Sequence, residues 1–165
     1  MKTFLLILSG QKHFLSGTEQ LKAIESLAMS TRAEEGFVFL DREIRDVEDP
    51  FFVNFTDMPL VVGKSGVDFC PSLIPYANAS CTSSMWDRTR LGRVLSEIRK
   101  FNPSRVVVVG AETQGAILLT AYGLKVMGVD PIVLEPMCFS TDEYLHAAAI
   151  SIMADSYRIR VETEL

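Results

Sequence analysis

Short, uninterrupted apolar runs recur along the 165-residue chain and constrain its fold more than any other feature. Each run is too short for a typical helix. The first five do not alternate with polar residues, which is typical of strands buried on both faces of a parallel sheet. The last run alternates and fits an edge strand. The predicted strands cover residues 4–8, 37–40, 59–63, 105–110, 131–135 and 157–163.

Stretches with the apolar spacing of amphipathic helices lie between these runs and begin near Thr18, Thr89 and Ser140. The last starts with Ser140 and Glu143 in the spacing of a capping box. Alternation of strands and helices predicts a three-layer α/β/α fold with a mostly parallel six-stranded sheet. We expect residues 1–165 to form a single domain, with segment 70–88 as a long loop because it has no clear period.

The charge balance argues against two classes of partner. Sixteen basic and 21 acidic residues give a net charge of −5, whereas nucleic acids and anionic membranes attract clustered Lys and Arg. No apolar run approaches the length that spans a bilayer. The N-terminal run is short and has no cleavage site, so it predicts a buried strand rather than a signal peptide. Three cysteines without a pairing framework indicate reduced thiols, and we expect a cytoplasmic protein.

The segment GAETQG (110–115) follows a predicted strand and opens a helix, as a phosphate-binding loop does. The Lys and the Ser or Thr of such a loop are absent, because Ala116 and Ile117 stand in their places. A bare helix N-terminus can still hold an anion through its backbone N–H groups. A nucleotide-binding module therefore stays open as an alternative, and phosphate or nucleotide binding would identify it.

The longer segment VVGAETQGAILLTAYGLKVMG resembles the core signature of the isochorismatase-like cysteine hydrolases, a family that includes the nicotinamidases. The nucleophilic cysteine of that signature corresponds to Ala116. The residues in register with the signature are Gly110, Thr113, Thr120, Ala121 and Gly128. The resemblance implies an isochorismatase-like α/β/α fold.

Other segments extend the resemblance over nearly the whole chain. LLILSGQKHF resembles the first strand of the family, with Gln11 and Phe14 matching and Ser9 at the position of the catalytic Asp. VVGKSGVDF is similar to the strand that carries the catalytic Lys, which corresponds to Lys64, with Phe69 downstream. The closing helix and strand are also similar to those of the family.

The resemblance implies a triad in which Asp and Lys activate the Cys for attack on an amide or related bond through an acyl-enzyme. Ala116 provides no nucleophile and Ser9 provides no carboxylate. Because the members of a triad act as a unit, losing two of them should remove nearly all catalysis. The family's oxyanion hole uses backbone N–H groups that correspond to Glu112 and Ala116, after a cis peptide that would be Ala111–Glu112. The expected pocket residues are Gln11, Phe14, Phe69, Ala111, Glu112 and Gly115.

Lys64 would lack its acidic partner if it lay in such a pocket, because Ser9 stands where the Asp should be. A buried, unpaired ammonium is costly, so we expect it to pair with Glu112, with Asp68 and Glu135 as second choices. The alternative is that Lys64 is an ordinary exposed lysine at the end of a strand.

We predict neither a metal nor a cofactor. The nicotinamidase branch binds metal through an Asp and His cluster after the second strand, whereas segment 41–52 holds acids and no His. A solvated charged loop is the simpler interpretation of that segment.

The sequence thus favours a catalytically degenerate member of this family that binds a small molecule or a protein partner, or serves as a structural subunit. Because family members commonly assemble, we expect a homo-oligomer. The alternative is an amidase in which Ala116 replaces an original cysteine, or one that uses another nucleophile such as Cys70 or Cys138.

Overall fold

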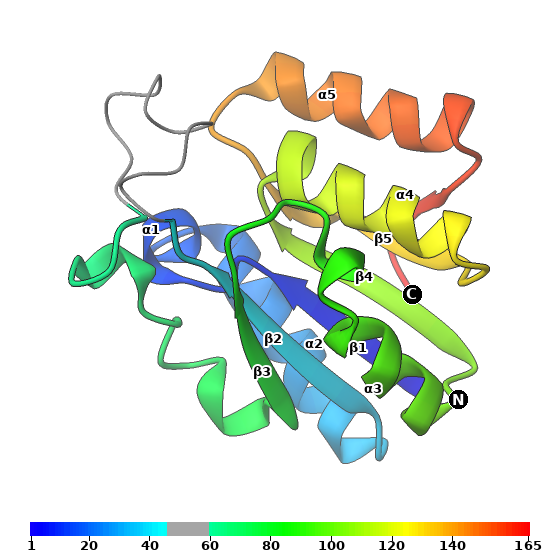
Figure 1. Ribbon diagram of the computed structural model, residues 1–165, viewed down its shortest axis with the longest axis horizontal. Coiled ribbons are helices and arrows are strands. Elements are labelled where there is room, and N and C mark those ends of the chain that lie inside the picture. The colour runs from blue at the N-terminus through cyan, green and yellow to red at the C-terminus, as the bar shows by residue number, and fades with distance from the viewer. Residues whose placement is uncertain (46–59) are drawn as a thin grey trace.

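The computed structural model describes residues 1–45 and 60–165, and they build a six-stranded sheet with helices on both faces (Figure 1). The strand order is β3-β2-β1-β4-β5-β6, and every pairing is parallel. The α/β prediction is therefore confirmed. The strands are β1 (Thr3–Leu8), β2 (Phe37–Glu43), β3 (Ala79–Ser83), β4 (Arg105–Ala111), β5 (Pro131–Phe139) and β6 (Arg160–Glu162).

The helices divide between the two faces of the sheet. Helix α2 covers one face, while α3, α4 and α5 cover the other (Figure 1). The helices are α1 (Lys12–Leu15), α2 (Glu19–Ala33), α3 (Arg93–Phe101), α4 (Leu118–Val126) and α5 (Glu143–Ser151). Single π-helical turns, Thr113–Ile117 and Ile152–Ser156, precede α4 and follow α5. Short 3₁₀ turns lie at Ser65–Val67, Ile74–Tyr76 and Arg88–Leu91.

The pleat of the central strands explains this layering. Successive side chains of a strand point to opposite faces, so an all-apolar strand fills two cores at once. In β1, Phe4 and Leu6 pack in the core under α3 and α4, while Leu5 and Ile7 pack in the core under α2. All six residues of β1 are buried.

The predicted third strand, residues 59–63, is wrong as an element of the sheet. Residue 59 lies outside the described residues, and Val61 makes only an isolated bridge with Arg45. The third strand is β3, inside the segment 70–88 that was expected to be a loop. Strand β3 lies at the sheet edge and alternates between partly buried and exposed residues, so its sequence ASCTS has no apolar run.

The predicted capping box of the last helix is also wrong. The N-cap residue is Asp142, whose side chain accepts a hydrogen bond from the Leu145 N–H at 3.0 Å. Ser140 instead accepts a hydrogen bond from the backbone N–H of Asp142 at 3.1 Å. Among the described residues, no helix is both long and apolar enough to cross a membrane.

Candidate functional site

The carboxyl ends of the central strands bring Ser9 and Ala116 to the same edge of the sheet. Ser9 directly follows β1 and is buried with a positive φ of 47°. Ala116 lies in the π turn after β4 and is also buried, as part of the core beneath α4. Both positions lie at the edge where parallel α/β sheets commonly bind ligands.

A fully buried arginine lies beside Ser9. The Arg88 guanidinium donates from Nη2 to Ser9 Oγ at 3.2 Å. It also donates from Nε to Asp41 Oδ2 at 2.7 Å, while Nη2 reaches Glu43 Oε2 at 3.1 Å. The backbone N–H of Ser9 donates to the same Asp41 oxygen at 3.3 Å. The position next to Ser9 is thus occupied by a cation that already has its counterions.

A second arginine completes this cluster of two acids and two bases. Arg45 Nε donates to Glu43 Oε1 at 2.5 Å, and its guanidinium lies 5.8 Å from the centre of the Trp86 ring. Asp41 and Glu43 are alternate residues at the end of β2, so the strand pleat directs both to one face, and Arg45 follows two residues beyond the strand. We call Asp41, Glu43, Arg45 and Arg88 the charged cluster.

The turn that carries Arg88 is fixed from both sides. The Arg88 N–H donates to Thr120 Oγ1 at 3.1 Å, and that hydroxyl donates to the Trp86 carbonyl at 3.0 Å. Asp87 caps the 3₁₀ turn by accepting a hydrogen bond from the Thr89 N–H at 3.0 Å. The arginine is therefore positioned by its backbone as well as by its ion pairs.

Burial has opposite consequences for the acid and the base of this cluster. It lowers the pKa of Arg88, but the neighbouring Asp41 and Glu43 outweigh it, so the pKa of Arg88 is raised. Burial also raises the pKa of Asp41, and the attraction of Arg88 opposes that rise. An arginine with a raised pKa holds its proton at every physiological pH, so Arg88 cannot act as a base.

Lys64 lies apart from this cluster. Its side chain is exposed, and among the described residues it forms no ion pair with Glu112. The expected pairing of Lys64 with Glu112 is therefore wrong. The second choices are also occupied, since Asp68 pairs with Lys12 at 3.3 Å and Glu135 lies 3.7 Å from the Nε2 atom of His146.

The charges that affect the pKa of Glu112 belong to the charged cluster rather than to Lys64. Burial raises its pKa, the negative charge of Glu43 raises it further, and Arg45 lowers it. The peptide bond between Ala111 and Glu112 is cis, as expected from the family resemblance. The Glu112 carbonyl accepts hydrogen bonds from the N–H groups of Gly115 and Ile117, both at 3.1 Å.

Two glycines allow the chain to pack tightly around this turn. Gly110 has a φ of 117°, and a Cβ there would lie 2.0 Å from the Leu8 carbonyl oxygen. Gly115 faces the indole of Trp86, which would lie 3.4 Å from a Cβ at this position. A side chain at Gly110 would push β4 away from β1, so this glycine is required where the two strands meet.

The other predicted pocket residues mainly join elements of the fold. Gln11 Nε2 donates to the Glu43 carbonyl at 3.0 Å, and the Glu43 N–H donates to Gln11 Oε1 at 2.6 Å. Phe14 is buried in the core under α2. Phe69 forms a backbone bridge with Gln11, and the Arg42 guanidinium lies 4.9 Å from the centre of its ring.

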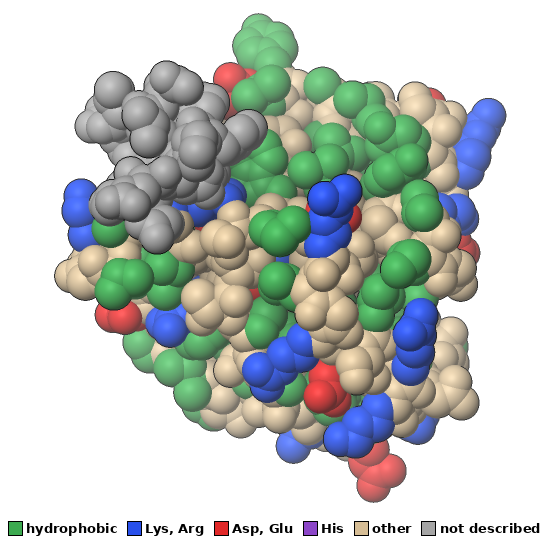
Figure 2. Space-filling model, viewed as in Figure 1, with side chains coloured by type: hydrophobic (Ala, Val, Ile, Leu, Met, Phe, Trp, Pro, Cys, Tyr) green, Lys and Arg blue, Asp and Glu red, His purple; other side chains and the backbone are tan. Residues whose placement is uncertain are grey.

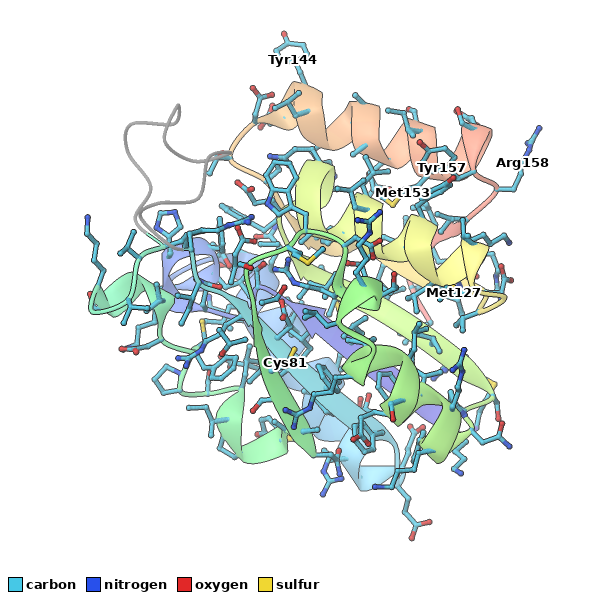
Figure 3. The ribbon with its side chains drawn as sticks, in the orientation of Figure 1. Cys81, Met127, Tyr144, Met153, Tyr157 and Arg158 are labelled. Atoms are coloured by element: carbon cyan, nitrogen blue, oxygen red, sulfur yellow. The ribbon has the colours of Figure 1, made fainter. Side chains whose placement is uncertain are left out.

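None of the three thiols is prepared for nucleophilic attack. Burial is the main influence in each case, raising the pKa of Cys70 to about 11 and that of Cys81 to about 12. It raises the pKa of Cys138 as well, and that thiol donates to the Leu134 carbonyl at 3.1 Å. Cys81, labelled in Figure 3, lies 3.3 Å from Asp41 Oδ1. The reactive form of cysteine is the thiolate, and a raised pKa disfavours it.

Thr113, His146 and Glu135 form a chain of contacts that the sequence did not indicate. His146 Nδ1 lies 2.9 Å from Thr113 Oγ1, and Glu135 lies near the other ring nitrogen. The order of these three residues resembles that of the nucleophile, the base and the acid in a catalytic triad. However, Thr113 is fully buried and its hydroxyl donates to the Phe139 carbonyl at 3.1 Å. These contacts join the π turn before α4 to β5 and α5.

Sequence reasoning missed the charged cluster because segment 41–52 was expected to be a solvated loop. That expectation is wrong for Asp41, Glu43 and Arg45, which are buried, while residues 46–52 lie outside the described residues. The alternation of D-R-E-I-R at the end of a predicted strand was the available signal. Within the described part of the chain, no group of three or more His, Cys, Asp or Glu side chains is placed to hold a metal ion.

Solved structures with the same fold include several amidases. A pyrazinamidase/nicotinamidase from Streptococcus mutans UA159 is 15% identical, with a TM-score of 0.82 over 98% of this chain and 100% of that one. An N-carbamoylsarcosine amidase from Thermoplasma acidophilum is 15% identical, with a TM-score of 0.81 over 98% and 96%. A putative isochorismatase hydrolase from Oleispira antarctica is 21% identical, with a TM-score of 0.74 over 98% and 93%. At these identities the likeness shows the fold alone.

The family of this chain follows from a comparison of its sequence with family models. A comparison with curated proteins found no significant match. The family model described as the isochorismatase domain matches residues 3–164, which is nearly the whole chain. Together with the strand order and the turn after β4, this match shows that the chain belongs to the isochorismatase family, whose members include hydrolases such as nicotinamidase.

Proposed function

We propose that this chain is a catalytically degenerate, cytoplasmic member of the isochorismatase family that acts by binding or as a subunit of a homo-oligomer. One observation carries the proposal: Ser9 accepts a hydrogen bond from the buried Arg88, where the resemblance implies a carboxylate that activates the nucleophile. A carboxylate in that role needs a basic oxygen free to take a proton. A hydroxyl beside a guanidinium cannot supply one.

The position of the nucleophile supports the same conclusion. Ala116 is buried in the core beneath α4 and carries no reactive atom. Lys64, the third residue implied by the resemblance, is exposed. The raised pKa values of the three thiols argue against a relocated cysteine nucleophile.

Release of ammonia from a panel of small amides, including nicotinamide, tests the proposal. We expect no release by the wild type above that of the buffer. The matched control is the Ser9→Asp, Ala116→Cys double variant, which introduces the two missing side chains into the same fold. Turnover by the control alone would support the proposal, because the fold would then still admit an amide.

Turnover by the wild type would contradict the proposal. In that case Cys70→Ser, Cys81→Ser and Cys138→Ser single variants would identify a relocated thiol, because only the variant lacking the nucleophile should lose the activity. Retention of activity by all three variants would exclude a thiol mechanism.

A further inference from the structure

Strand β3 forms one edge of the sheet. Within the described part of the chain, β2 is the only strand that pairs with it (Figure 1). The register of the two strands is continuous from Ala79 to Ser83, without a bulge. The edge of a sheet presents backbone N–H and C=O groups that can pair with the strand of another chain.

The backbone groups of Ser80 and Thr82 point to the outer side of β3. The Ser83 carbonyl accepts a hydrogen bond from the Ile44 N–H at 2.9 Å, so it faces β2. Successive residues of a paired strand direct their backbone groups to alternate sides, and those of Ser80 and Thr82 therefore face away from β2. Among the described residues, no other segment forms a backbone hydrogen bond with these two residues.

The two edges of the sheet differ in how well they are protected. Strand β6, at the opposite edge, has three residues, and two of them, Arg160 and Glu162, pair with each other at 2.5 Å. A short strand with charged side chains is a common way to prevent pairing with other chains. Strand β3 has five residues, ASCTS, with neither a charge nor a proline. Its edge therefore lacks the protection that β6 has.

Arg42 lies over β3 on the face of the sheet that α2 covers. It is opposite Thr82 in the register, and its Nε donates to Thr82 Oγ1 at 3.0 Å. Leu40, on the same side of β2, belongs to the core under α2. Among the described residues, no carboxylate pairs with Arg42. Its positive charge thus reaches across β3 without being neutralised.

Arg93 provides a positive charge on the other face of the sheet. The Cys81 side chain points to this face and packs against the core that contains Val94 of α3. Burial raises the pKa of Cys81 to about 12 and the charge of Asp41 raises it further, whereas Arg88 and Arg93 oppose the rise. Arg93 is exposed and has no ion pair among the described residues. One arginine without a counterion thus lies near the middle of β3 on each face.

The surface next to this edge is basic as well. Helix α3 and the turn before it carry four exposed cations, Arg90, Arg93, Arg99 and Lys100, whereas Glu97 is the only acidic residue of α3. Figure 2 shows Lys and Arg side chains gathered over the part of the molecule where Figure 1 places α3. The whole chain has a net charge of −5, so this surface differs in sign from the rest. Such a surface attracts an acidic partner.

We propose that the edge of β3 binds an extended acidic segment of another protein, which joins the sheet as an added strand. The proposal names a partner for the binding role proposed above and rests on that role. Adjacent side chains of an added strand point to opposite faces of the sheet. Two adjacent acidic residues would therefore reach Arg42 on one face and Arg93 on the other. A peptide fits this edge better than a nucleic acid does, because only a peptide backbone can continue the ladder of β3.

Fluorescence anisotropy of the full chain with a labelled synthetic peptide tests the proposal. The probe is a short peptide of Thr and Val with a central Glu-Asp pair, and the control peptide has Gln-Asn at the centre. We expect the acidic peptide to bind roughly tenfold more tightly, because each exposed ion pair contributes a factor of up to about five.

Variants of the two arginines test the charge contacts. Arg42→Gln and Arg93→Gln should each weaken binding of the acidic peptide by roughly threefold to fivefold and leave that of the neutral peptide unchanged. Arg160→Gln is the matched control, since Arg160 lies on β6 at the opposite edge of the sheet. It should change the binding of neither peptide, and circular dichroism should show that all three variants are folded.

Methylation of alternate backbone nitrogens of the acidic peptide tests the added strand. Successive N–H groups of such a strand point alternately toward β3 and toward solvent. Methylating one set should abolish binding, and methylating the other set should leave it unchanged. Hydrogen exchange at the amides of Ser80 and Thr82 should slow when the unmodified peptide binds. Equal binding of the two methylated peptides would overturn the proposal.

Three further results would overturn it. The first is equal binding of the acidic and neutral peptides, or of neither. The second is displacement of the acidic peptide by an oligonucleotide of the same charge, which would show a surface that binds anions of any kind. The third is self-association of the wild type that Arg42→Gln or Arg93→Gln removes, because the edge would then hold a second copy of this chain.

These results are distinguishable from failure of the proposed lack of catalysis. A protein that binds the acidic peptide and releases ammonia from amides would contradict that lack of catalysis and leave the β3 edge assigned. An inactive protein that does not bind the peptide would do the reverse.

Discussion

Arg88 brings a permanent positive charge into a part of the protein that is closed to solvent. Removing a guanidinium from water is costly, and the two carboxylates that pair with it offset this cost. Such clusters are poor evidence for high stability, because apolar side chains of similar size often do as well. They are sensitive to the loss of one member, since the others stay buried with unbalanced charge.

Arg88→Met therefore should destabilise the protein by about 3–5 kcal/mol, the usual effect of breaking a buried pair from one side. Asp41 would lose the cation that pairs with it while remaining buried, and Glu43 would keep only its pairing with Arg45. Urea unfolding measures the change. The control is Arg90→Met, whose ion pair with Asp87 is long at 3.7 Å and exposed on the arginine side, and which should cost at most about 1 kcal/mol. Equal losses in the two variants would show that the charged cluster does not stabilise the fold.

Glu112 makes the stability depend on pH in the opposite sense to a paired carboxylate. Its folded pKa is raised, by burial first and by Glu43 second, so the native state holds the proton more tightly than the unfolded state. Stability therefore falls as pH rises from the ordinary glutamate pKa, about 4.3, through the raised folded value. Glu112→Gln should be more stable than the wild type at neutral pH, and this gain should vanish below about pH 4.

Unfolding at a series of pH values measures this difference. The exposed Glu34 provides the matched control, because Glu34→Gln should change the stability little at any pH. A wild type that is more stable than Glu112→Gln at neutral pH would mean that Glu112 gains more from Arg45 than it loses by burial.

At the scale of elements, strands buried on both faces could be predicted from their own sequences, whereas the edge strand could not, because its composition depends on its position in the sheet. Strands β1 and β4 are buried on both faces, so their apolar runs identify them directly. The edge strand β3 has polar residues because one side of it meets solvent. The apolar PLVVG was mistaken for it, and of its residues 60–63 only Val61 makes a bridge.

One part of the candidate site could be predicted from a local motif, and another part could not. The turn after β4, with Ala116 and the cis Ala111–Glu112 peptide, follows from a local motif. The contact of Arg88 with Asp41 joins residues 47 positions apart, so no local sequence pattern predicts it. Its geometry depends on the 3₁₀ turn and on β2 ending at the same edge of the sheet. Local sequence patterns therefore predict the backbone turns of a site more readily than the side-chain contacts within it.

One experiment at the start of α5 distinguishes the N-cap seen in the structure, Asp142, from the one expected from the sequence, Ser140. Asp142→Ala should cost about 1 kcal/mol, the usual effect of removing an N-cap, because the carboxylate accepts the Leu145 N–H. Ser140→Ala should cost less, since Ser140 bonds to the turn before the helix. Thermal or urea unfolding compares the two variants. A larger loss for Ser140→Ala would restore the capping box predicted from the sequence.

At the scale of the whole molecule, the chain has the isochorismatase fold, and buried ion pairs lie beside Ser9 at its candidate site. A buried core on both faces of the sheet accounts for the fold without any ligand. It does not account for the exposed apolar side chains of α4, which are Leu119, Tyr122 and Val126. Burial of these side chains in the proposed homo-oligomer would link folding to association, because such a contact forms only between native chains.

If the chain forms the proposed homo-oligomer, its melting temperature should depend on protein concentration. A tenfold increase in concentration stabilises a folded dimer by about 1.4 kcal/mol relative to two unfolded chains, which raises Tm by about 2 °C for a dimer of this size. Scanning calorimetry of the wild type at several concentrations should show this rise. Val126→Glu, which puts a charge among the exposed apolar side chains of α4, should weaken this dependence on concentration. A constant Tm for the wild type would contradict the proposed homo-oligomer.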